Sequence, residues 1–155
     1  MNFDEAFAKL IAHEGGFSND RRDAGGQTKY GISKAAYPGE DIANLTLDRA
    51  KAIYLRDYWG PAACDAMPDP AKLQVFDAAV NHGVKTTIRL IQSSVGAVAD
   101  GVIGPNTLQA VQSMPAPRFI ARFNAQRLAL YAGLSEWPAF GRGWALRISD
   151  NLLQA

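Results

Sequence analysis

Residues 70–82 place the strongest constraint on the fold, because they read as a helix that is apolar on nearly every side. The segment runs from Pro70 to His82 and stops at Gly83, the residue type that most often closes a helix. A helix with apolar side chains all round needs packing partners on several faces, so it belongs at the centre of a helical core. With 155 residues, the chain is long enough to supply those partners.

The remaining pattern predicts a mainly α protein with one small β element. Residues 15–33 are rich in Gly, Asp, Asn and Ser, which predicts a loop and a short, irregular hairpin after the first helix. Pro105 can begin a further helix after a tight loop. Helices are expected over residues 2–14, 46–59, 86–95, 117–133 and 139–153, with Asn2 and Thr46 as N-caps. Leu47, Ala50, Tyr54 and Tyr58 form an apolar stripe on the second of these helices, and Phe140, Trp144, Ile148 and Leu152 follow helical spacing on the last.

Composition excludes several classes of function. Sixteen basic and fifteen acidic residues leave a net charge of +1, which gives no reason to expect nucleic-acid binding. The single cysteine, Cys64, cannot form an internal disulfide and has no histidine near it in sequence to activate it as a nucleophile. No cluster of residues has metal-ligand spacing, so we expect no metal and no cofactor. No apolar stretch approaches the length of a membrane span, so we expect no membrane insertion.

Glu14 is the first candidate catalytic residue. Helical geometry brings it to within roughly 20° of Phe3, on the apolar face of the first helix. It also lies at the negative end of the helix dipole, just before Gly15 and Gly16. Both placements disfavour the ionised carboxylate, so we expect a raised pKa, as a glycosidase requires of its general acid.

Asp23 and Thr28 follow in a glycine-rich segment. A carboxylate in this wetter segment would stay ionised and could orient a water molecule or stabilise positive charge, and the Thr28 hydroxyl could help to hold that water. Asp20, three residues earlier, is a competing candidate for the second carboxylate.

Aromatic and polar residues further along the chain could bind a sugar. Four rings could stack on sugar faces, although plain core packing is the alternative for those on helices. Asn81 and His82 end the central helix, where Asn81 could bind an N-acetyl group or cap its own helix. Arg127 and Arg147 lie within apolar helices and are expected to pair with a buried acid such as Asp77. The four candidate aromatic residues are Tyr30, Tyr54, Tyr58 and Trp59.

The segment from Glu14 to Ser33 resembles the signature of glycoside hydrolase family 108, the N-acetylmuramidase endolysins. That signature reads Glu-Gly-Gly, then Asp-x-Gly-Gly-x-Thr, then Gly-Ile-Ser, and this chain carries all three parts. The similarity continues through Tyr54, Tyr58-Trp59 and the run from Asp77 to Gly83. The run Asp100-Gly101-x-x-Gly104-Pro105-x-Thr107 looks like the peptidoglycan-associated half of the family.

This resemblance implies a lysozyme-like single domain over residues 1–155. Residues 1–90 would form the catalytic part, and residues 91–155 a helical, peptidoglycan-associated part. It implies cleavage of the β-1,4 bond between N-acetylmuramic acid and N-acetylglucosamine, with Glu14, Asp23 and Thr28 as the catalytic residues. Phage-type lysozymes share a similar Glu, Asp, Thr triad, but the step from Asp to Thr is one residue shorter here.

The resemblance also suggests a monomeric phage or prophage endolysin. We expect no signal peptide, because the N-terminal helix carries acids in its first turn. Synthesis in the cytoplasm, release through a holin-like pore and action on peptidoglycan strands in the periplasm would follow. A lytic transglycosylase and a non-catalytic wall-binding module remain alternatives, and the stereochemistry of the reaction stays open.

Overall fold

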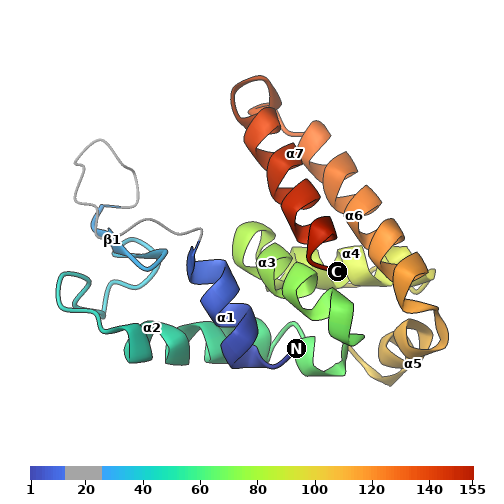
Figure 1. Ribbon diagram of the computed structural model, residues 1–155, viewed down its shortest axis with the longest axis horizontal. Helices are drawn as coiled ribbons and strands as arrows, with labels where there is room; N and C mark the ends of the chain where they lie inside the picture. Colours follow the sequence, from blue (N-terminus) through green and yellow to red (C-terminus); the bar gives the residue numbers. More distant parts are fainter. Residues whose placement is uncertain (13–25) are drawn as a thin grey trace. The chain divides into compact units, whose positions relative to one another are not determined.

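The structure is a computed structural model that describes residues 1–12 and 26–155. The described backbone is mainly helical with one two-stranded hairpin, which confirms the expected mainly α, lysozyme-like fold (Figure 1). It divides into two compact units, residues 2–57 and residues 58–155 together with Met1. The division between these units falls after Asp57. Within the second unit, α4 (Val84–Val95) packs against both α3 (Lys72–His82) and α6 (Ala116–Ala132).

The first unit begins with α1 (Phe3–Ala12), whose start is fixed by a capping box. The Glu5 N–H donates to Oδ1 of Asn2 at 2.9 Å, and the Asn2 N–H donates to a Glu5 carboxylate oxygen at 2.9 Å. These two bonds satisfy backbone donors that the first turn leaves without partners, and they confirm Asn2 as the N-cap. Ala6, Phe7 and Leu10 form the buried face of this helix.

The hairpin consists of β1 (Thr28–Lys29) and β2 (Ile32–Ser33), which pair antiparallel with Thr28 opposite Ser33. Tyr30 and Gly31 form the two-residue turn, and both have positive φ angles, 52° and 74°. Two left-handed residues in succession match the right-handed twist of short hairpins. Ile32 is buried at 1% exposure and anchors the hairpin in the core of its unit.

The second helix, α2 (Leu47–Tyr54), is capped by Thr46, whose hydroxyl accepts the Arg49 N–H at 3.2 Å. The helix continues as a π-helical turn, η1 (Leu55–Trp59), which the regular spacing of the sequence did not predict. Ala50 and Tyr54 are buried as expected, but Leu47 is 46% exposed. The prediction for Leu47 is wrong because this residue lies in the first turn, ahead of the covered part of the helix.

The second unit is a helical assembly built around α3. Seven successive residues of this helix, from Leu73 to Ala79, are buried, which confirms the predicted central helix. It packs against α4, α7 and two 3-10 turns, while α6 packs against α4 and α7 (Figure 1). Besides α3, α4 and α6, this unit contains η2 (Cys64–Ala66), η3 (Asp69–Ala71), α5 (Pro105–Ser113) and α7 (Trp137–Leu153).

Helix ends in the second unit follow the residue types that predicted them. Pro105 begins α5, and Gly83 and Gly96 end α3 and α4 with φ angles of 81° and 74°. On α7, Ile148 is buried, whereas Phe140 and Leu152, which follow the same helical spacing, are 58% and 43% exposed. The periodicity identified the correct face of α7, but neighbouring helices cover that face only in part. No helix among the described residues is long and apolar enough to cross a membrane.

Candidate functional site

The predicted acid pair lies outside the described residues. The described backbone ends at Ala12, before Glu14, and resumes at Gly26, after both Asp20 and Asp23. The roles of these three acids therefore stay predictions. The structure describes the hairpin that follows them, and it describes the C-terminal end of α3, which carries the family-like run from Asp77 to Gly83.

Thr28, the third predicted catalytic residue, is half-buried at the start of β1. Hydrogen bonds made by its two neighbours in the chain, Gln27 and Lys29, hold this strand in place. The Lys34 N–H donates to the Gln27 carbonyl at 2.8 Å, and Lys29 Nζ donates to the Ala43 carbonyl at 3.2 Å. Thr28 thus sits on an anchored strand, which would hold its hydroxyl in a defined place.

Tyr30 holds a backbone conformation that non-glycine residues rarely adopt. Its carbonyl oxygen accepts a hydrogen bond from the Tyr54 hydroxyl at 2.9 Å, which fixes the turn against α2. The Tyr30 ring is half-buried, and Lys29 Nζ lies 5.5 Å from its centroid. Backbone strain of this kind persists only where the surroundings enforce it, and it is common at ligand-binding sites. Tyr30 keeps part of its surface exposed and stays a candidate for contact with a sugar.

Tyr54 and Trp59 are both 1% exposed, so the structure assigns their rings to core packing. The Tyr54 ring packs edge-on against Phe7 with centroids 5.5 Å apart, and the Trp59 ring packs edge-on against Phe76 at 5.4 Å. This is the alternative that the sequence left open for aromatic residues on helices. Tyr58, half-buried in the same π-helical turn as Trp59, stays a candidate for contact with a sugar. Turns of this type recur at functional sites.

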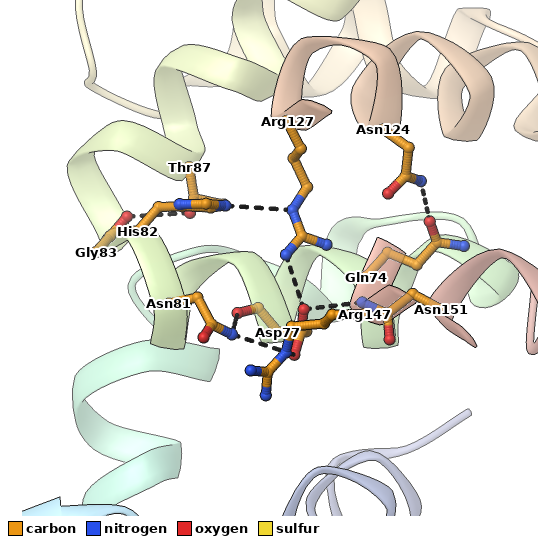
Figure 2. Close-up of polar contacts among 10 residues, drawn as sticks. All are labelled: Gln74, Asp77, Asn81, His82, Gly83, Thr87, Asn124, Arg127, Arg147 and Asn151. Atoms are coloured by element: carbon orange, nitrogen blue, oxygen red, sulfur yellow. Dashed lines mark hydrogen bonds and ion pairs between the residues drawn. The ribbon is translucent and has the colours of Figure 1, made fainter. Parts of the chain in front are cut away.

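Asp77 is the centre of a buried polar network in the second unit (Figure 2). Its carboxylate accepts from Arg127 Nη2 at 2.8 Å, from Arg147 Nε at 2.9 Å and from Asn151 Nδ2 at 2.8 Å. Asp77 is 3% exposed and Arg127 is fully buried. These bonds confirm the predicted pairing of Arg127 and Arg147 with Asp77, and they connect α3, α6 and α7 through one carboxylate. Asn151 was not identified from the sequence.

Asn81, at the end of α3, binds its own helix. Its Nδ2 donates to the Asp77 carbonyl at 2.7 Å and lies 3.2 Å from Oδ1 of the Asp77 carboxylate (Figure 2). Asn81 therefore makes a hydrogen bond to its own helix, which was the alternative to binding an N-acetyl group. The residue is exposed overall, so this bond orients an amide that solvent can reach.

His82 is half-buried beside Asn81, with its ring 4.6 Å from that of Tyr131. Arg127 Nε donates to His82 Nε2 at 3.4 Å (Figure 2). Burial and, to a smaller extent, the neighbouring Arg127 charge together lower the pKa of His82 to about 4. His82 is thus a neutral acceptor near pH 7, which suits hydrogen bonding better than proton donation.

Gln92 is a central polar residue that the sequence reasoning missed. It is 1% exposed, and its Nε2 donates to Asp100 Oδ1 at 2.7 Å and to the Val102 carbonyl at 3.0 Å. Its amide oxygen accepts the Gly101 N–H at 2.9 Å, where Gly101 has a φ of 80°. The loop motif that starts at Asp100 is therefore built around Gln92. A signal was present, because Gln92 lies four residues after Ile88 and three before Val95, on the apolar face of its helix.

No group of His, Cys, Asp or Glu side chains within residues 1–12 and 26–155 is arranged to hold a metal ion. Cys64 is buried, and burial raises the pKa of its thiol far above the ordinary range. This places the cysteine among inert structural thiols, as expected from its sequence context.

Three comparisons with known proteins bear on this site. The family model described as Glycosyl hydrolase 108 matches residues 7–83, a range that contains every predicted catalytic and sugar-binding residue. No curated protein matches the chain. The solved structure of SagA from Brucella abortus is similar over 98% of this chain and 92% of its own, with a TM-score of 0.89 and 34% sequence identity.

Proposed function

This chain belongs to the glycosyl hydrolase 108 family, and we propose that it hydrolyses peptidoglycan at the β-1,4 bond between N-acetylmuramic acid and N-acetylglucosamine. The observation that carries the proposal is the family match over residues 7–83, because it spans Glu14, Asp23 and Thr28 within one continuous motif. The anchored hairpin that presents Thr28 supports it.

In the proposed reaction, Glu14 donates its proton to the glycosidic oxygen as the bond from that oxygen to C1 of N-acetylmuramic acid breaks. Asp23 stays ionised and stabilises the positive charge that develops on the sugar ring or activates the incoming water. Thr28 helps to position that water. The water supplies a hydroxyl to C1, and its remaining proton returns the acid pair to its starting state.

Sugar contacts in this proposal come from residues that keep exposed surface. Tyr30 and Tyr58 are half-buried and offer ring surface, while Asn81 and His82 offer polar atoms at the end of α3. Tyr54 contributes indirectly, since its hydroxyl holds the Tyr30 carbonyl. Trp59 makes no sugar contact in this proposal and stabilises the core by packing against Phe76.

The substrate lies outside the cytoplasm, so the enzyme must reach it. We propose that the protein acts as a monomeric endolysin, made in the cytoplasm and released to the periplasm through a holin-like pore. Expression of the protein alone should then leave cells intact, and permeabilisation should start lysis. Prompt lysis on expression without a pore would contradict this route.

Replacement of Glu14 tests the catalytic assignment. Glu14→Gln should keep the melting temperature and lower the rate of clearing of permeabilised cells about 100-fold or more, because the general acid is lost. Asp23→Ala should also lower the rate strongly, and Asp20→Ala, in the same segment, serves as its matched control and should lower it little. A folded Glu14→Gln protein with near wild-type activity would overturn the proposal, and a reversed order of the two aspartates would assign the second carboxylate to Asp20.

A further inference from the structure

His82 is the last residue of α3, and α6 holds its half-buried ring within the second unit. Arg127, on α6, donates from Nε to His82 Nε2 at 3.4 Å (Figure 2). Tyr131, one turn further along α6, packs its ring 4.6 Å from the imidazole. One nitrogen and one side of the imidazole are therefore in contact with α6.

The direction of the bond from Arg127 determines where the imidazole carries its proton. A guanidinium group has only N–H donors and stays charged at ordinary pH values, so it does not accept a hydrogen bond. His82 Nε2 must therefore present its lone pair, and the single proton of the neutral ring lies on Nδ1. Burial and the Arg127 charge lower the pKa of His82 to about 4, so the ring is neutral near pH 7.

Arg127 is itself held in place by the buried network. It is 0% exposed, and its Nη2 donates to the Asp77 carboxylate at 2.8 Å. That carboxylate also accepts hydrogen bonds from Arg147 and Asn151 (Figure 2). The Arg127 guanidinium is thus bonded at two of its nitrogens, and it presents a fixed donor to His82.

The second ring nitrogen of His82, Nδ1, remains available to a bound molecule. Within the part of the chain that the structure describes, no group hydrogen-bonds to Nδ1. Nδ1 is also not among the buried polar atoms that lack a partner there, so it reaches solvent. An N–H group in this position can donate to an oxygen atom of a ligand.

We propose that Arg127 is a positioning residue that fixes His82 in the Nδ1–H tautomer, and that His82 then donates a hydrogen bond to an oxygen atom of the glycan. The inference rests on the proposed function, which makes His82 a sugar contact. It adds the direction of that contact and the buried residue that sets it. The accepting oxygen belongs to a sugar hydroxyl or to the carbonyl of an acetamido group, and no proton is transferred.

Two amide substitutions separate the roles of the two ring nitrogens. The amide nitrogen of His82→Asn takes the place of Nδ1, whereas the amide oxygen of His82→Gln takes the place of Nε2 and can accept from Arg127. We expect KM for soluble glycan strands to be about fivefold higher for His82→Gln than for His82→Asn, which corresponds to one hydrogen bond, with similar kcat values. His82→Asn should have the lower melting temperature, since it leaves the Arg127 Nε donor without an acceptor.

A purely structural role for His82 would give a different pattern. The variant with the lower melting temperature would then also have the higher KM, and this result would overturn the inference, as would equal KM values. A wild-type protein that cleaves no glycan would contradict the proposed function. An active wild type whose two variants share one KM would contradict only this inference.

De-N-acetylated glycan strands identify the accepting oxygen. If the difference in KM between His82→Gln and His82→Asn disappears on these strands, the hydrogen bond goes to the acetamido carbonyl. If the difference persists, the bond goes to a hydroxyl. Both results support a donor at the Nδ1 position.

Nitrogen-15 NMR of histidine-labelled protein tests the positioning role without any substrate. The chain has two histidines, so a His82→Gln sample identifies the signals of His82. We expect the Nδ1–H tautomer in the wild type, and in Arg127→Met a shift toward the Nε2–H form that free histidine favours. An unchanged tautomer in folded Arg127→Met would overturn the role of Arg127. If Arg127→Met does not fold, the wild-type spectrum still decides, because an Nε2–H tautomer there would overturn the proposal.

Discussion

The two units of the chain differ in how deeply their ion pairs are buried. In residues 2–57, ion pairs lie at the surface, as between Arg49 and Glu40, whose closest atoms are 2.6 Å apart and whose side chains are 51% and 19% exposed. In residues 58–155, Asp77 and Arg127 pair at 2.8 Å with side-chain exposures of 4% and 0%. The chemical pairing is the same, but its surroundings differ.

This difference shows which interactions define the structure of each unit. Surface pairs are screened by water and salt, so they contribute little to stability. A buried carboxylate between two guanidinium groups must keep all of its partners, because a single unpaired buried charge is strongly destabilising. The first unit is thus defined by caps, a tight turn and its apolar core, and the second by a polar network that fixes three helices at once.

The largest expected effect comes from breaking the buried network. Asp77→Asn should lower the free energy of unfolding by about 3–5 kcal/mol, because it leaves Arg127 and Arg147 without their shared counter-charge. Urea unfolding measures this loss. The matching surface change, Glu40→Gln, removes the partner of Arg49 and should alter stability little.

A double substitution sharpens the interpretation. Adding Arg147→Gln to Asp77→Asn should recover part of the lost stability, since it removes one of the two uncompensated charges. Equal losses for Asp77→Asn and Glu40→Gln would remove the contrast between the two units.

A smaller effect is expected from His82, which borders the network. Its pKa falls from 6.5 to about 4 on folding, chiefly through burial. Between these two values the unfolded chain binds a proton that the folded protein does not, so the free energy of unfolding decreases as the pH falls from about 6.5 toward 4. His82→Gln should reduce this slope. Melting curves at pH 7 and pH 5 check it, and an unchanged slope would show that His82 does not titrate this way.

The smallest effect belongs to the first unit. Thr46→Ala should lower the free energy of unfolding by about 1 kcal/mol, because the Arg49 N–H loses the hydroxyl oxygen that accepts its hydrogen bond. Thr46→Ser keeps a hydroxyl at the same place and should stay close to wild type. Denaturant unfolding of both variants measures the difference, and a loss as large as that for Asp77→Asn would refute the ordering proposed here.

Local signals predicted most helix boundaries and the main buried pair. Pro105, Gly83 and Thr46 mark helix ends through their own backbone preferences or side chains, and these act wherever the residue lies. The pairing of Arg127 with Asp77 was predictable because a charge on an apolar helix face requires a partner.

Other features depend on contacts that no local pattern encodes. Phe140 follows the periodicity of its helix but is exposed, because burial depends on which neighbouring helix covers it. Tyr54 and Trp59 were candidates for sugar binding with core packing as the alternative, and their burial at 1% exposure follows from tertiary contacts that the sequence pattern does not encode. The π-helical turn at Leu55–Trp59 breaks the regular spacing from which Tyr58 was placed on the buried stripe.

Mass spectrometry of peptidoglycan digested by the purified protein tests the central claim most directly. We predict fragments that end in reducing N-acetylmuramic acid, with a mass increase of one water per bond cleaved, and their loss with Glu14→Gln. Fragments that end in anhydro-N-acetylmuramic acid would instead indicate a lytic transglycosylase. Intact sacculi after treatment with folded protein would indicate a non-catalytic wall-binding module, and either result would contradict the hydrolase proposed here.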